Sequence, residues 1–126
     1  MNRVLFPRSC QLKESLISLS KEPIVWNNTK LNAQQKSAVN GILSSNCRPT
    51  PFIIFGPPGT GKTVTVVEAI LQVLTRIPNS RIIACTALNS SADLIVELLL
   101  KSELIPEKDL IRISAQHRLF PQMNNI

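Results

Sequence analysis

A segment rich in glycine and proline, Gly56–Thr63, constrains the fold of this chain more than any other feature. Its sequence is GPPGTGKT, and it directly follows the apolar run Phe52–Phe55. After it, apolar side chains recur at helical spacing over residues 62–76. A buried strand that ends in such a loop, with a helix starting inside the loop, is typical of an α/β domain.

Three stretches have the apolar spacing of a helix. They are residues 33–43, 62–76 and 90 to about 101. Asn32 is placed to cap the first of them. Ser90 and Asp93 match a capping box at the start of the third. Pro78 and Asn79 predict a turn after the second helix.

Three short runs that contain apolar residues complete the pattern. They are residues 52–55, 81–86 and 110–114. The first is apolar without alternation, which is typical of a strand buried on both faces. We interpret the second as another buried strand and the third as a strand. Strands that alternate with helices predict an α/β fold with a parallel sheet, helices on both faces and right-handed crossovers.

The region before residue 32 has a weaker pattern, interrupted by Pro7 and Pro23. We therefore expect residues 1–31 to be a linker or the edge of a preceding domain, and residues 32–126 to form one domain.

The composition excludes several classes of protein. Hydrophobic residues make up 44% and charged residues 17% of the chain, as in ordinary globular proteins. No apolar run is long enough to span a membrane, and the three cysteines form no zinc-binding pair. The net charge of +6 favours partners that carry phosphate, and the N-terminus lacks a signal-peptide pattern, which predicts an intracellular protein.

The spacing G-x-x-x-x-G-K-T is that of a phosphate-binding loop. Its glycines let the backbone approach a ligand, and its successive N–H groups suit an anion. Lys62 can reach the β- and γ-phosphates, and the Thr63 hydroxyl can bind Mg²⁺. Two prolines stiffen the loop. The predicted nucleotide site consists of Gly56, Pro57, Pro58, Gly59, Thr60, Gly61, Lys62 and Thr63.

The flanking sequences resemble a known family. The stretch LNAQQKSAV is similar to the glutamine motif of superfamily-one helicases of the nonsense-mediated-decay type. The run RPTPFIIFGPPGTGKTVTVVEAILQVL, with NSSADLI after it, most resembles Armitage and its vertebrate relatives, which are RNA helicases of small-RNA silencing. The resemblance extends over about residues 31–118.

This resemblance implies a RecA-like P-loop NTPase lobe that uses ATP and Mg²⁺, with Gln35 hydrogen-bonded to adenine. It also implies single-stranded RNA and small-RNA silencing proteins as partners, and a location in the cytoplasm and in RNA granules. The family usually has alanine-proline-serine-asparagine where this chain has TALN, residues 86–89. Because Leu88 lacks the family's hydroxyl, only Asn89 and Ser90 carry over as RNA contacts.

Hydrolysis needs an acidic pair at the end of a later apolar strand, which holds Mg²⁺ and orients the attacking water. No apolar strand predicted here ends in Asp-Glu, and a second lobe with its arginine finger is missing. We therefore expect a truncated first RecA-like lobe, either a fragment or a short isoform, with no complete catalytic set and negligible hydrolysis alone.

Two alternatives stay open. The chain could be a non-catalytic RNA-binding or interaction module that retains the loop as a scaffold, which Leu88 and the missing carboxylates favour. A small P-loop kinase is the other, but the lid and acceptor-site carboxylates that it needs are not found.

Overall fold

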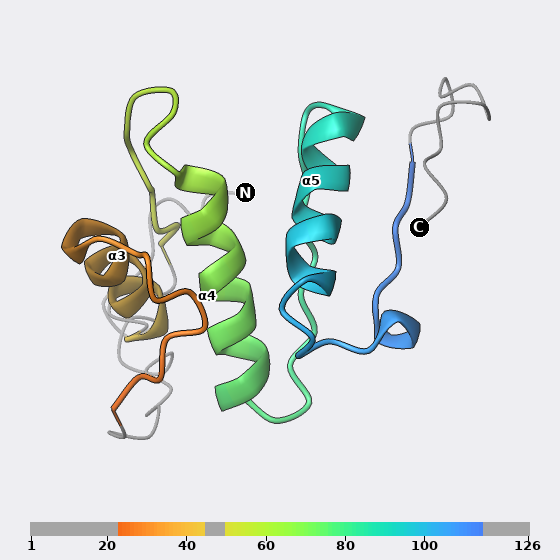
Figure 1. Cartoon of the computed structure of the whole chain (residues 1–126), viewed down its shortest axis with the longest axis horizontal. Coiled ribbons are helices and arrows are strands. Elements are labelled where there is room, and N and C mark those ends of the chain that lie inside the picture. Colours follow the sequence, from red (N-terminus) through yellow and green to blue (C-terminus); the bar gives the residue numbers. More distant parts are fainter. Residues whose placement is uncertain (1–22, 45–49, 115–126) are drawn as a thin grey trace. The chain divides into compact units, whose positions relative to one another are not determined.

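A computed structural model describes residues 23–44 and 50–114 (Figure 1). The chain divides into two compact units, Met1–Ile82 and Ile83–Ile126. Of the predicted segment 1–31, only residues 23–31 are described. The C-terminal part of the predicted domain 32–126, from residue 115 onward, lies outside the described residues.

Helix α3, Ala33–Leu43, begins and ends where the sequence predicts. The side chain of Asn32 accepts a hydrogen bond from the backbone N–H of Gln35, and the side chain of Gln35 accepts one from the backbone N–H of Asn32. This reciprocal capping box satisfies two backbone donors that a helix start leaves without intrahelical acceptors. The predicted cap at Asn32 is therefore confirmed.

Helix α4, Lys62–Arg76, also has the predicted bounds. Gly61, in the left-handed conformation with φ of 80°, is its N-cap, and Asn79 has φ of 59° in the turn that follows the helix. The two helices pack on a core of Val39, Leu43 and Ala69. Half-buried apolar side chains lie against this core, namely Ile24, Trp26, Ile42 and Val73.

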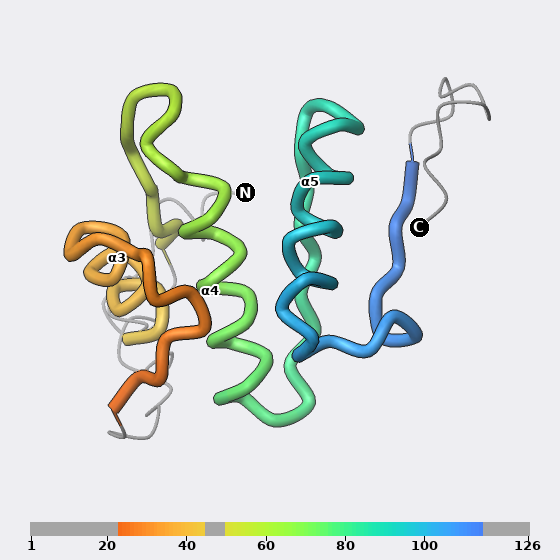
Figure 2. Tube along the Cα trace, in the orientation of Figure 1, coloured from red at the N-terminus to blue at the C-terminus, as the bar shows by residue number. Residues whose placement is uncertain are grey.

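Residues 23–31, which we call the strap, form the third part of this first unit. Ile24 and Trp26 of the strap pack against the core between α3 and α4, and Leu31 is buried. Lys36 on α3 places its ammonium 5.6 Å from the centre of the Trp26 ring, a cation–π arrangement. In Figure 2 the strap, in orange, passes beside α4 before it enters α3.

The second unit contains α5, Asn89–Leu100, and the 3₁₀ helix η1, Glu107–Asp109. Val96 and Leu99 are the buried residues of α5. The predicted capping box at Ser90 and Asp93 is wrong. The N-cap is Leu88, no side chain caps the helix, and the Asp93 carboxylate instead pairs with Arg112.

The prediction of three strands is wrong for the part of the chain that the structure describes. Residues 52–55, 81–86 and 110–114 form neither helix nor strand there. Phe55, Ile83 and Ile111 are 95%, 90% and 85% exposed. An apolar run reports only that a segment is hydrophobic, whereas a strand also needs a neighbour to accept and donate its ladder hydrogen bonds. No such neighbour is present among the described residues.

Candidate nucleotide-binding site

The glycine-rich loop folds back on itself ahead of α4. The Thr60 hydroxyl donates a hydrogen bond to the carbonyl oxygen of Pro57 over 2.8 Å. Gly59 and Gly61 both have positive φ, 79° and 80°. This is the conformation that L side chains rarely adopt, which is why the loop needs glycine at these two positions. Gly56 has no positive φ, so only two of the three glycines in the loop adopt this conformation.

The start of α4 presents unpaired donors to the loop. Gly61 provides no side-chain cap, and the first turn has no acidic residue. Thr65 directs both its N–H and its hydroxyl to the carbonyl oxygen of Gly61, at 3.0 and 3.1 Å. Among the described residues, no side chain accepts a hydrogen bond from the amides of Gly59, Gly61, Lys62 or Thr63. Free amides and the positive end of a helix dipole are the features that bind anions in other proteins.

Lys62 reaches back over the loop. Its ammonium donates hydrogen bonds to the carbonyl oxygens of Gly56 and Pro57, at 2.8 and 2.7 Å. The cation therefore lies at the loop whose amides would hold an anion, and it can exchange neutral carbonyl acceptors for phosphate oxygens. This donor set, of backbone amides and one ammonium, fits a polyphosphate.

Gln35 connects α3 to the loop. Its side-chain nitrogen donates a hydrogen bond to the carbonyl oxygen of Thr60 over 3.3 Å, while its side-chain oxygen accepts from Asn32. A primary amide has two N–H donors and two lone pairs, so one donor and one lone pair remain. That pair suits the edge of adenine, which a glutamine amide can bind through two hydrogen bonds.

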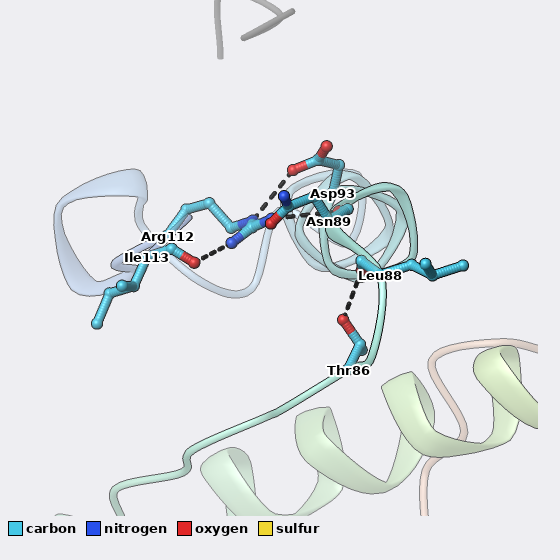
Figure 3. A network of polar contacts seen from close by, with 6 residues as sticks. All are labelled: Thr86, Leu88, Asn89, Asp93, Arg112 and Ile113. Carbon is cyan, nitrogen blue, oxygen red and sulfur yellow. Dashed lines mark hydrogen bonds and ion pairs between the residues drawn. The ribbon is translucent and has the colours of Figure 1, made fainter. Parts of the chain in front are cut away.

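The predicted RNA contacts lie in the other unit, at the start of α5. Figure 3 shows Arg112 directed at this helix start, with its guanidinium between Asp93 and Asn89. Arg112 pairs with Asp93 over 3.0 Å and donates to both the backbone and the side-chain oxygen of Asn89, at 3.2 Å each. Arg112 also donates to the carbonyl oxygen of Ile113. Ser90 is exposed.

Three polar residues for which the sequence predicted no role hold neighbouring segments in place. Glu68 and Gln72 are buried on α4 and hold the strap, and Arg112 holds the start of α5. The sequence contains one indication that Glu68 and Gln72 are buried. Glu68 and Gln72 stand four residues apart within the apolar sequence of α4, so they share a face with residues predicted to be buried.

The described residues hold no group of three or more His, Cys, Asp or Glu residues that could bind a metal ion. This leaves the Thr63 hydroxyl as the predicted protein ligand for Mg²⁺, completed by phosphate oxygens. Within the same residues, no helix is both long and apolar enough to cross a membrane.

Comparison with known families identifies the fold. Residues 30–125 match the model of a family described as an AAA domain, AAA_11. The chain belongs to this AAA_11 family. The match includes α3, the glycine-rich loop, α4 and α5, so the P-loop domain predicted from the loop is confirmed at the level of the family.

Individual relatives of this AAA_11 chain are helicases. It is 50% identical over 91 residues to the human protein named RNA helicase Mov10l1, covering 72% of the chain and 8% of that protein. To the Drosophila melanogaster protein named Probable RNA helicase armi it is 37% identical over 108 residues, 86% of the chain and 9% of that protein. To the chicken Putative helicase MOV-10 it is 45% identical over 118 residues, 91% of the chain and 12% of that protein.

The chain thus spans about a tenth of the length of these relatives. The resemblance to helicases of the Armitage type is confirmed. No solved structure matches the chain.

Proposed function

We propose that residues 56–63 bind the triphosphate of ATP with Mg²⁺, and that the chain is the ATP-binding segment of an ATP-dependent RNA helicase. The observation that carries this proposal is the loop itself. Two glycines with positive φ turn the chain immediately before α4. The Lys62 ammonium donates hydrogen bonds to carbonyl oxygens of the same loop.

The roles of the loop residues follow from their contacts. Lys62 would leave the carbonyl oxygens of Gly56 and Pro57 and bind the β- and γ-phosphates, where it neutralises charge. The Thr63 hydroxyl, in the first turn of α4, would bind Mg²⁺. Gln35, with one donor and one lone pair left, would read adenine. Mg²⁺ supplies charge neutralisation between the phosphates when it is bound.

The helicase part of the proposal is supported by the relatives, whose names describe RNA helicases. We propose that the helicase to which this segment belongs binds RNA, and that Asn89 and Ser90 contact the RNA. That the domain is RecA-like is likewise a proposal, supported by the similarity of its sequence to these helicases. The link to small-RNA silencing and the cytoplasmic location stay predictions from the family resemblance.

The test is an equilibrium titration of the 126-residue chain with a fluorescent ATP analogue and Mg²⁺. We expect Lys62→Ala to weaken binding by roughly a hundredfold, because a charge-assisted contact to phosphate is lost. Lys30→Ala is the matched control, since it removes the same charge from an exposed residue of the strap. Equal binding by the wild type and Lys62→Ala would reject the site.

A second candidate is a non-catalytic RNA-binding module, favoured by the absence of an acidic metal-binding group among the described residues and by the net charge of +6. It predicts that the chain binds single-stranded RNA equally well with and without ATP, and that the affinity falls steeply with salt. RNA binding that changes with nucleotide would favour the helicase segment instead.

A further inference from the structure

The most unusual polar group in the first unit is the carboxylate of Glu68, which is only 1% exposed in the middle of α4. Burying a charge is costly unless hydrogen bonds replace its water. Here the replacements come from the strap, 40 and 41 residues earlier in the chain. The backbone N–H groups of Asn27 and Asn28 each donate to one carboxylate oxygen, both over 3.0 Å.

Gln72, one turn further along α4, completes the arrangement. Its side-chain nitrogen donates to Glu68 over 2.9 Å and to the carbonyl oxygen of Val25 over 2.7 Å. Glu68 and Gln72 therefore hold the strap through two backbone donors and one backbone acceptor. We call this pair the clamp. Because these bonds are made to backbone groups, the clamp holds the backbone of the strap directly.

The strap leads from the clamp to the nucleotide site in a few residues. The Asn28 side chain accepts from the N–H of Lys30 over 2.9 Å, and the N–H of Leu31 donates to the carbonyl oxygen of Asn28. This turn leads to Asn32, which caps α3. The N–H of Asn32 donates a hydrogen bond to the side-chain oxygen of Gln35. The nitrogen of the same Gln35 amide contacts Thr60 in the loop.

We propose that Glu68 is a positioning residue for base recognition: by clamping the strap, it sets where Gln35 stands relative to the phosphate-binding loop. Gln35 cannot move along or turn about α3 without breaking the capping box to Asn32, and Asn32 is tied through a four-residue turn to the backbone that Glu68 holds. The end of the loop, Lys62 and Thr63, and the clamp lie on the same helix, α4, so one rigid element would position both the phosphates and the base. The inference rests on the proposed function.

The experiment compares the affinities of the 126-residue chain for ATP, GTP and inorganic tripolyphosphate, each with Mg²⁺. Glu68→Gln keeps the shape of the side chain but leaves one oxygen where two accepted backbone N–H groups. We expect the preference for ATP over GTP to fall roughly tenfold, the effect of about one lost hydrogen bond. The affinity for tripolyphosphate, which has no base, should stay within about twofold.

Four further variants keep the test decisive. Gln35→Ala should lower the preference to the same extent, and the double variant Glu68→Gln/Gln35→Ala should lower it no further, since both act through one contact. Gln72→Ala, which keeps the bonds from the strap to Glu68 and removes those of Gln72 to Val25 and to Glu68, should have a smaller effect in the same direction. It replaces Glu68→Gln as the test if that variant does not fold.

Glu97→Gln, the same change at an exposed position, is the control.

The outcomes separate the inference from the proposed function. Absence of Lys62-dependent nucleotide binding in the wild type would reject the proposed function. Lys62-dependent binding without a preference for ATP, additive effects of Glu68→Gln and Gln35→Ala, or an equal loss of affinity for all three ligands would overturn the role of Glu68. The last result would mean that the clamp is structural only.

Discussion

Gln35 and Thr60 are joined by a hydrogen bond of 3.3 Å between the side-chain nitrogen of one and the backbone oxygen of the other. This bond connects the first turn of α3 to the glycine-rich loop, 25 residues later in the sequence. It brings the residue predicted to read adenine to the segment predicted to hold phosphate. The two motifs, found separately in the sequence, are thus in contact.

A comparison of Gly61→Ala with Gly59→Ala should distinguish two effects. One is the loss of stability from backbone strain, and the other is the change in base preference from displacing Gln35. Both glycines have positive φ, and an alanine there costs about 1–2 kcal/mol. A Cβ at Gly59 meets nothing within 4 Å, whereas one at Gly61 would lie 2.6 Å from the side-chain nitrogen of Gln35. We expect similar losses of stability in urea, but a reduced preference for ATP over GTP only in Gly61→Ala. An equal change in preference in both variants would contradict this assignment.

Glu68→Ala should destabilise the chain strongly. It leaves the N–H groups of Asn27 and Asn28 without their acceptor, and each unsatisfied buried group costs roughly 1–3 kcal/mol. We expect a loss of about 3 kcal/mol in the free energy of unfolding, measured by urea titration.

Glu97→Ala is the control for this prediction. Among the described residues, the Glu97 carboxylate pairs with Lys101 on the surface of α5. Glu97→Ala should therefore lower the free energy of unfolding by no more than about 0.5 kcal/mol. Amide hydrogen exchange adds a local readout, because Asn27 and Asn28 should exchange faster in Glu68→Ala even under folding conditions. Unchanged exchange at these two amides would show that the strap does not depend on Glu68.

The bounds of α3 and α4 could be predicted to the residue because their signals are local. Asn32 and Gln35 form a capping box within one turn, and Gly61 precedes a continuous apolar periodicity that ends before Pro78. The loop was found for the same reason, since its function depends on residues that are adjacent in sequence.

The contacts that lie outside such local patterns could not be predicted. The partners of Glu68 are 40 and 41 residues away, and they are backbone groups, which carry no residue-type signal. Asp93 matched a capping box by spacing, but its carboxylate pairs with Arg112, 19 residues later. The apolar runs at 52–55 and 110–114 signalled hydrophobicity without saying which segment would pair with them, and the strands predicted there are absent from the described residues.

A double-mutant cycle on Arg112 and Asp93 should give a coupling free energy of about 1 kcal/mol. Both side chains are mostly buried, 18% and 20% exposed, so water screens their attraction less than at the surface. The comparison pair is Glu97 and Lys101, which is more than half exposed and should give about 0.3–0.5 kcal/mol. Unfolding in urea at low and high salt measures both cycles. A coupling at the exposed pair that equals or exceeds the buried one would contradict the prediction.

Phe55→Lys should reduce self-association without destabilising the fold. Phe55 is 95% exposed at the end of an apolar run that precedes the loop, and its neighbour Ile53 is 81% exposed. Exposed apolar segments with unpaired backbone groups favour pairing between chains, which a lysine opposes. We expect the concentration at which light scattering rises to increase several-fold, with the free energy of unfolding unchanged within about 0.5 kcal/mol.

Leu71→Lys provides the contrast for this last prediction, because Leu71 is 4% exposed on α4. Burying the lysine charge there should unfold the first unit and increase association. If Phe55→Lys instead destabilises the chain as Leu71→Lys does, then Phe55 is buried in solution. That result would contradict its exposure in the structure and support the buried strand that the sequence predicts at residues 52–55.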